Sequence, residues 1–211
     1  MYAFADRDWS RKNQRNHPLK AGLLLISVVL LAASFSPLLN MVSASLQRDQ
    51  AFPVIADFGT GWTRAFLQLN RAALTQVADQ QGLTATKKGA ERPTVQLTLK
   101  PGRYPGVAMV EPCMDWSGYG ALSLELYSPH ANPINIVLRI HDYWHNQAYS
   151  DRFNRTLTLR PGSNRIQIPL SSIVESPAGR EMDMKRIGGL MLFVVDVEDT
   201  IRLYPGVIRL E

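Results

Sequence analysis

The amino-acid sequence predicts an all-β domain, a two-sheet antiparallel β-sandwich, preceded by one N-terminal transmembrane helix. Three observations lead to this fold class. A stretch without charged residues lies near the N-terminus, at 21–47. After residue 80, apolar and polar residues alternate in several short segments, which is typical of strands with one buried face. Pro-Gly pairs at 101–102, 161–162 and 205–206 indicate turns between such strands.

The transmembrane helix is expected at Ala21–Leu39, which has the sequence AGLLLISVVLLAASFSPLL. At about 1.5 Å per residue this segment is about 28 Å long, close to the thickness of the hydrocarbon core of a bilayer. Residues 1–20 carry most of the flanking basic side chains, and only Arg48 follows closely. The positive-inside rule therefore predicts a cytoplasmic segment at 1–20 and a single pass. In a Gram-negative cell the helix lies in the inner membrane and the C-terminal domain is periplasmic.

A cleaved signal peptide is the alternative interpretation of this segment. Val42-Ser43-Ala44 has the small-x-small form of a cleavage site. The leading segment is long, however, and its apolar core exceeds the ~7–15 residues usual in signal peptides. This length favours an uncleaved anchor, and both interpretations export the rest of the chain.

Composition and charge exclude several classes of function. The chain has 211 residues, a formal net charge of +5 and one cysteine, Cys113, so it can form neither an intrachain disulfide nor a multi-cysteine zinc site. Residues 1–50 contribute +3 of the charge, and the remaining 161 residues hold 17 basic against 15 acidic side chains. The exported part therefore lacks the dense basic surface of a nucleic-acid-binding domain, and we expect no nucleic-acid partner.

We expect residues 40–50 to form a short polar tether and residues 51–211 to form the sandwich. A strand end followed by a glycine turn is predicted at 57–62, and the segment 63–79 fits either a helix or a strand. Alternation then predicts strands at 95–99, 122–127, 134–141, 157–159, 166–168 and 207–210. The unbroken apolar run Leu190–Val195 is the pattern of a strand buried on both faces.

Alternation also predicts a polar surface. Successive side chains of a strand point to opposite sides, so the apolar parity of two strands places Glu125 and Tyr127, and Arg139 and His141, on the outer side. Tyr143 joins them if the extended conformation continues. Such a mixture of charged and aromatic groups suits a polyol, because rings stack on a pyranose while planar polar groups bind its hydroxyls. The alternative is an ordinary solvated sheet face.

The segment 141–153 is unusually rich in aromatic residues and histidines, and loops at the rim of a rigid scaffold commonly bind ligands. Candidate ligand-binding residues in it are Trp144, His145, Tyr149, Asp151 and Arg152. Alternatively, Trp144 and Phe153 fill the edge of the core while Asp151 and Arg152 form a structural ion pair.

Metal binding and catalysis are not expected. His141 and His145 are four residues apart, which aligns them only on a helix, whereas this segment is predicted as strand and loop. A nucleophile elbow, a phosphate loop and a dinucleotide fingerprint are absent from the sequence. Glu125, Asp142 and Asp151 supply carboxylates for a hydrolase, but their spacing does not show that they flank a scissile bond. We therefore expect no catalytic residue, no metal and no cofactor.

Several short motifs resemble those of the galactose-binding-like jelly-roll domains, a group that includes many carbohydrate-binding modules. They are Asp57-Phe58 with Trp62, Asp115–Tyr119 (DWSGY), His141-Asp142, Gly162–Ile166 (GSNRI) and the closing Leu203–Leu210 (LYPGVIRL). More narrowly, residues 48–211 resemble the exported domain appended to some VanZ-like membrane proteins, although the multi-helix membrane part of those proteins is missing here. Pro205-Gly206 stands where the binding modules usually carry an acidic residue, which weakens an inherited calcium site, although Asp57 could still serve one.

The resemblance implies a non-catalytic jelly roll that binds a saccharide or an envelope glycan at or near the cell envelope. An alternative is an envelope module that binds another protein, such as a membrane-protein partner supplying the missing helices. A glycan hydrolase is the third alternative.

Overall fold

The computed structural model describes residues 6–77, 95–110 and 115–211, and for residues 6–19 it describes the backbone alone. Its contacts divide the chain into two compact units, Met1–Ser43 and Ala44–Glu211.

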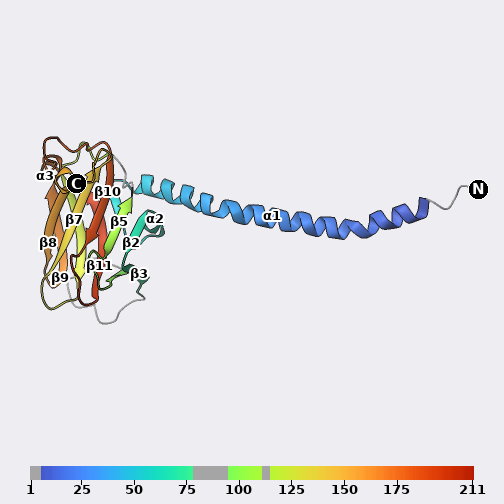
Figure 1. Cartoon of the computed structure of the whole chain (residues 1–211), viewed down its shortest axis with the longest axis horizontal. Coiled ribbons are helices and arrows are strands. Elements are labelled where there is room, and N and C mark those ends of the chain that lie inside the picture. Colours follow the sequence, from blue (N-terminus) through green and yellow to red (C-terminus); the bar gives the residue numbers. More distant parts are fainter. Residues whose placement is uncertain (1–5, 78–94, 111–114) are drawn as a thin grey trace, which may run out of the picture. The chain divides into compact units, whose positions relative to one another are not determined.

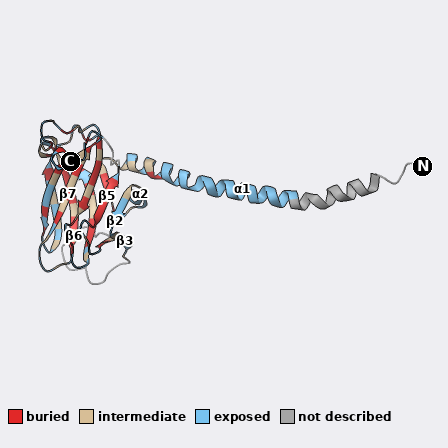
Figure 2. Ribbon diagram, in the orientation of Figure 1, coloured by how far each residue is buried: buried red, intermediate tan, exposed pale blue. Residues whose placement is uncertain are grey.

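Helix α1 (Asp6–Ala51) is a single 46-residue helix that includes the predicted transmembrane segment (Figure 1). Its part Lys20–Ala51 has a window of mean hydropathy 2.3, long and apolar enough to cross a membrane. The large apolar side chains of this segment, from Leu23 to Leu46, are exposed (Figure 2). The predicted tether at 40–50 is also helical, which fits the absence of glycine and proline between Met41 and Gln50.

The second unit is a sandwich of two antiparallel sheets, as the sequence predicts (Figure 1). The six-stranded sheet has the order β3-β4-β11-β6-β9, and β1 also pairs with β11. Its strands are β1 (Val54–Asp57), β3 (Ala72–Gln76), β4 (Val95–Leu99), β6 (Ala121–Ser128), β9 (Gly162–Pro169) and β11 (Ile201–Leu210). The five-stranded sheet has the order β2-β5-β10-β7-β8. Its strands are β2 (Leu67–Asn70), β5 (Gly106–Val110), β7 (Ile134–Asp142), β8 (Phe153–Leu159) and β10 (Ile187–Phe193).

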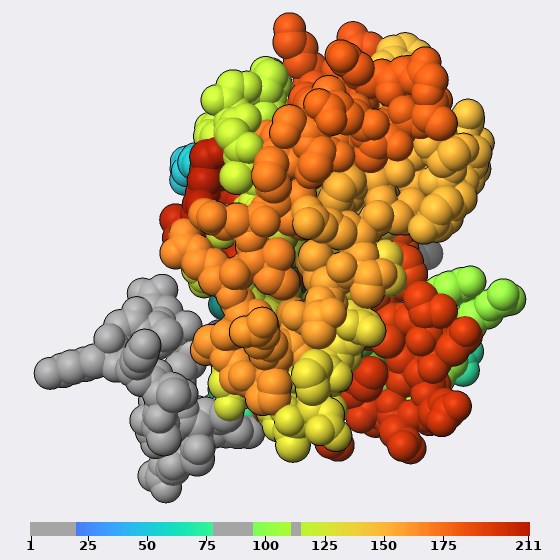
Figure 3. Space-filling view, turned by 90° about the vertical axis from the view of Figure 1, so that its left-hand side faces the viewer, coloured from blue at the N-terminus to red at the C-terminus, as the bar shows by residue number. Residues whose placement is uncertain are grey.

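In its described residues this unit also has three short helical segments: α2 (Gly61–Ala65), η1 (Tyr149–Asp151) and α3 (Leu170–Val174). Figure 3 shows one side of the domain, where amber and orange atoms of the β8, β9 and α3 part of the chain cover much of the surface.

The core lies between the two sheets and follows the predicted alternation. In β6 the buried apolar side chains are Leu122, Leu124 and Leu126. In β7 they are Ile136, Leu138 and Ile140. Trp116, which precedes β6, is fully buried, so one residue of the DWSGY motif is part of this core.

The structure corrects one predicted turn and settles one ambiguity. Gly102 and Gly162 have positive φ angles of 146° and 87°, as turn glycines do, but Pro205-Gly206 lies inside β11. The register of β11 against β6 shifts between Pro205 and Ile208, so this Pro-Gly pair forms a bulge, where a strand tolerates proline. The ambiguous segment 63–79 contains the end of α2 followed by strands β2 and β3.

The interpretation of Leu190–Val195 as a strand buried on both faces is wrong. Leu190, Leu192 and Val194 are buried in the core, whereas Met191 and Phe193 are half-buried on the outer face of β10. The outer face of the five-stranded sheet therefore carries an apolar centre.

Candidate functional site

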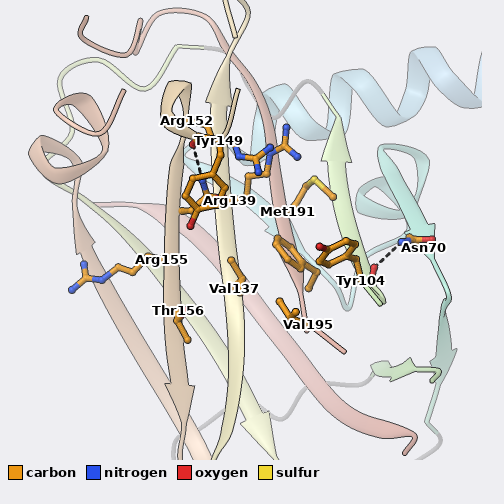
Figure 4. A pocket seen from close by; sticks show the side chains of 12 residues that line it. Asn70, Tyr104, Val137, Arg139, Tyr149, Arg152, Arg155, Thr156, Met191 and Val195 are labelled. Atoms are coloured by element: carbon orange, nitrogen blue, oxygen red, sulfur yellow. Dashed lines mark hydrogen bonds between the residues drawn. The ribbon is translucent and has the colours of Figure 1, made fainter. Parts of the chain in front are cut away.

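A groove of about 620 Å³ lies on the outer face of the five-stranded sheet (Figure 4). All five strands of that sheet, or the loops at their ends, contribute to it. Its lining residues are Asn70, Tyr104, Val137, Arg139, Tyr149, Arg152, Asn154, Arg155, Thr156, Met191, Phe193 and Val195. We call this site the groove below.

The floor of the groove is apolar and aromatic. Met191 and Phe193 of the central strand β10 lie beside Val137 of β7, because Phe193 and Val137 are register partners. The ring of Tyr104 meets that of Phe193 edge-on, with centroids 5.9 Å apart and an interplanar angle of 85°. The side-chain amide of Asn70 donates to the Tyr104 carbonyl at 2.6 Å. The Tyr104 backbone is thus attached to strand β2, and the two perpendicular rings expose apolar surface to the groove.

One end of the groove is cationic. Arg139 projects from β7, and Arg152 follows η1 and precedes β8. The guanidinium carbon of Arg152 lies 5.1 Å from the centroid of the Tyr149 ring, a cation–π contact. Figure 4 shows Arg139, Arg152 and Tyr149 together at this end, whereas Arg155 points away from it on β8.

His145 holds Arg139 in place. The Nη2 atom of Arg139 lies 3.2 Å from Nε2 of His145, and Nδ1 of His145 lies 2.8 Å from the Asp151 carbonyl oxygen. A carbonyl oxygen only accepts, so Nδ1 carries the proton and Nε2 is free to accept from Arg139. This assignment makes His145 a neutral partner of the arginine.

Behind the groove, Arg180 binds two buried carboxylates. Its Nη1 and Nη2 donate to Asp142 at 2.5 and 2.9 Å, and its Nε donates to Asp151 at 2.5 Å. The backbone N–H of Asp183 donates to Asp142 at 2.8 Å. The hydrogen bond from Arg180 lowers the pKa of Asp151 to about 2, with a further contribution from the Asn146 N–H. Burial by itself raises the pKa of Asp142, but Arg180 and Asp183 outweigh it and lower that pKa.

His141 lies beside this network. Its ring centroid is 5.1 Å from that of His145, and a Cβ atom on Gly189 would lie 2.5 Å from its Cε1. The ring therefore covers the backbone of β10. Burial, and then the nearby charge of Arg139, lower the pKa of His141 to about 4, so this imidazole is neutral at neutral pH.

The structure brings together most, but not all, of the predicted site residues. Arg139, Tyr149 and Arg152 line the groove, and His141, His145 and Asp151 support its cationic end. Tyr143 and Trp144 are exposed beyond the end of β7, with rings in edge-on contact at 5.6 Å, and they do not line the groove. Trp144 Nε1 donates to Asp183 at 3.3 Å.

Glu125 and Tyr127 are the exception, because they belong to the other sheet. Both lie on β6 of the six-stranded sheet, whereas Arg139 and His141 lie on β7 of the five-stranded sheet. The prediction that these four side chains share one surface is wrong, since the outer faces of the two sheets of a sandwich point in opposite directions. Strand parity was predicted well, but parity does not say to which sheet a strand belongs.

The alternative interpretation of segment 141–153, in which its aromatic and charged residues only support the fold, is half right. Phe153 is buried in the core, but Trp144 is 56% exposed. The ion-pair partner of Asp151 is Arg180 and not the adjacent Arg152.

Several groove residues were missed by the sequence analysis. Met191 and Phe193 were hidden in the unbroken apolar run of β10, although a two-residue period around Leu192 would have separated them from the core. Asn70, Tyr104 and Arg180 lie in segments without a recognisable motif, and only the topology brings them to this site.

Within the described part of the chain, no three His, Cys, Asp or Glu side chains are grouped as metal ligands would be. The carboxylate of Asp57, suggested by the resemblance as a calcium ligand, accepts the Gly59 N–H at 2.9 Å in the turn after β1.

The fold is similar to that of several solved structures. The family 11 carbohydrate-binding module from Clostridium thermocellum, in complex with a β-1,3-1,4-mixed-linked tetrasaccharide, is 15% identical with a TM-score of 0.50, covering 69% of this chain and 88% of the module. An exo-β-agarase is 17% identical with a TM-score of 0.55, covering 75% of this chain and 24% of its own. Another agarase is 13% identical with a TM-score of 0.52, covering 75% of this chain and 26% of its own. At identities this low, the structural similarity shows a shared jelly-roll sandwich and not a shared activity.

No protein-family model matches the chain, and no curated protein matches it. The narrower resemblance to the exported domain of VanZ-like proteins therefore stays a prediction.

Proposed function

We propose that the domain Ala44–Glu211 binds a saccharide in the groove of its five-stranded sheet, without catalysing a reaction. One observation carries the proposal: a single groove combines aromatic rings with fixed polar groups. Tyr104 and Phe193 offer apolar ring surface, and Asn154 and Arg139 offer hydrogen-bond donors beside it. A pyranose presents the matching pair of features, an apolar face and a rim of hydroxyls.

The carboxylates near the groove are unsuited to glycoside hydrolysis. Asp142 and Asp151 are buried, and Arg180 binds both of them and holds both pKa values low. A general acid needs a raised pKa and access to the glycosidic oxygen. The remaining candidate, Glu125, lies on the other sheet. These observations favour binding over turnover.

The similar folds support this proposal. A carbohydrate-binding module with the same sandwich is described in complex with a tetrasaccharide, and two agarases contain a similar domain within longer chains. Jelly rolls serve many purposes, and it is the groove, more than the fold, that supports saccharide binding.

Helix α1 is proposed to anchor this domain to the inner membrane. Its apolar part is long enough to cross a bilayer, and basic residues precede it. With residues 1–20 in the cytoplasm, the sandwich lies in the periplasm, where its ligand is an envelope glycan or an imported saccharide.

Binding can be tested with the full-length chain in a sugar-free polyoxyethylene ether detergent, since alkyl glycosides would compete for the groove. An array of neutral and acidic oligosaccharides identifies ligands, and calorimetric titration measures their affinity. We expect Tyr104→Ala and Phe193→Ala each to weaken binding by about tenfold or more, because each removes stacking surface.

Tyr127→Ala is the matched control, since it removes a half-exposed tyrosine from the opposite sheet. The proposal is wrong if no oligosaccharide binds, or if the control weakens binding as much as the groove variants do. If no saccharide binds, the alternative function, binding of a protein partner, is favoured.

A further inference from the structure

We propose that the groove selects acidic saccharides and binds their anionic group at Arg139 and Arg152. This inference rests on the proposed saccharide-binding function and specifies the chemical class of the ligand.

The charge of the lining points in this direction. Three arginines, Arg139, Arg152 and Arg155, line the groove, and its described lining contains no aspartate or glutamate. Burial is the main cause that lowers the pKa of Arg139, and the like charge of the neighbouring Arg152 lowers it further. A groove of this kind carries a positive potential and attracts anions.

The nearby carboxylates do not neutralise these arginines. Asp142 and Asp151 are both bound by Arg180, whose guanidinium uses all three nitrogen atoms for them. Among the residues that the structure describes, no salt bridge involves Arg139, Arg152 or Arg155. Arg180 therefore satisfies the acidic groups of the site and leaves the groove arginines uncompensated.

The partner of Arg139 is neutral as well. His145 accepts from Arg139 through Nε2 and donates through Nδ1 to the Asp151 carbonyl oxygen, so it orients the guanidinium without cancelling its charge. The Tyr149 ring positions Arg152 in the same way, by a cation–π contact. Both arginines are thus pre-oriented by groups that carry no negative charge.

Both arginines are also incompletely solvated. Their Nε atoms are buried without a hydrogen-bond partner. A charged group that has lost hydration gains more from an anion than a fully hydrated one does. A neutral saccharide would displace water from these guanidinium groups without supplying a negative charge, so the site discriminates against it.

A uronate carboxylate and a sulfate ester share the chemistry that this site recognises. The planar guanidinium pairs with a carboxylate through two parallel hydrogen bonds, and it also binds sulfate oxygens. The experiment below therefore includes both.

The test compares matched saccharides that differ only in charge. Tetragalacturonate is titrated against its fully methyl-esterified form, and a carrageenan tetrasaccharide against its desulfated form, on the full-length chain in polyoxyethylene ether detergent. Arg139→Gln and Arg152→Gln remove one charge each. Arg160→Gln is the control, because Arg160 is exposed, lies at the end of β8 outside the groove, and contacts Asn164 through its backbone alone.

We expect at least one acidic saccharide to bind about tenfold or more tightly than its neutral counterpart, and this preference to shrink as salt is added. Arg139→Gln and Arg152→Gln should each reduce affinity for the acidic form by about tenfold or more, while Arg160→Gln should not. Arg152→Gln should fold normally even if Arg139→Gln does not, because the only contact described for the Arg152 side chain is with the Tyr149 ring.

The inference is overturned, with the proposed function intact, if neutral forms bind as tightly as acidic ones or if the preference survives in both groove variants. If neither acidic nor neutral saccharides bind, the proposed function fails together with it. Preference for either acidic group supports the inference and identifies that group.

Discussion

Removing the Arg180 side chain should destabilise the domain strongly, because it would leave a buried carboxylate without its counter-charge. The Asp142 side chain has no exposed surface, and Arg180 supplies two of its hydrogen bonds. We predict that Arg180→Met, which keeps much of the length of the side chain, lowers the free energy of unfolding.

The magnitude follows from the burial of Asp142. Breaking a buried ion pair by removing one partner typically costs about 3–5 kcal/mol. The Arg180 side chain is 29% exposed, so water can enter when it is removed, and the Asp183 N–H remains as a donor. We therefore expect a loss near the lower limit, about 3 kcal/mol.

Urea unfolding of the full chain, followed by tryptophan fluorescence, measures this loss, and Trp116 in the core is a buried reporter. The urea dependence of the unfolding free energy should stay unchanged, so that a shift in midpoint reports stability. Asp142→Asn combined with Arg180→Met should recover at least half of the loss, because the stranded charge is gone.

Arg165→Met is the matched control, since it removes an arginine that also pairs with a carboxylate, Glu211, but is itself 56% exposed. We expect little change from it, as for surface ion pairs in general. If Arg180→Met and Arg165→Met had equal effects, or if the double variant were no more stable than Arg180→Met, the cluster would not be a buried charge network.

Three further predictions concern pH, packing and the membrane. The folded-state pKa of His141 is about 4, below its ordinary 6.5, so the unfolded chain binds more protons in this range. The free energy of unfolding should therefore fall by about 1–2 kcal/mol between pH 7 and 4.5, and His141→Asn should reduce this slope. Gly189→Ala would place a Cβ atom 2.5 Å from the His141 ring and should lower the stability measured by thermal unfolding by about 1–3 kcal/mol. Gly61→Ala is the control and should cost little, because a Cβ atom there would have no neighbour within 4 Å. Equal effects of the two variants would contradict the packing described. Val29→Arg at the centre of the apolar helix should release the protein from membranes on alkaline extraction, because it costs about 3 kcal/mol there; unchanged extraction would contradict the anchor.

Residue patterns predicted the sandwich because the signal they carry is local. Buried Leu122, Leu124 and Leu126 alternate with polar neighbours, and this period depends only on the geometry of one strand. The assignment of a strand to one sheet or the other depends on its pairing with strands distant in the sequence. β6 and β7 are consecutive in the chain and have the same parity signal, yet they lie in opposite sheets, which separated Glu125 and Tyr127 from Arg139 and His141.

The apolar run of β10 shows a second limit. Met191 and Phe193 look like core residues, because an apolar side chain in a strand has the same sequence signal whether it meets the core or a ligand. A third limit concerns the ion-pair partner of Asp142 and Asp151. This partner, Arg180, lies 38 and 29 residues away from them in the sequence and belongs to no motif. Composition alone singled out the segment 141–153, and two of its predicted residues, Tyr149 and Arg152, line the groove together with Arg139, which strand parity had indicated.

The location of the ligand is the central claim, and photo-cross-linking measures it most directly. The full-length chain is irradiated with a diazirine-bearing derivative of the saccharide that binds it most tightly, and labelled peptides are identified by mass spectrometry. We predict label on Tyr104, Tyr149 and Phe193, and competition of this labelling by the unmodified saccharide. Label on the β6 peptide that contains Glu125 and Tyr127, with none on the five-stranded sheet, would contradict it.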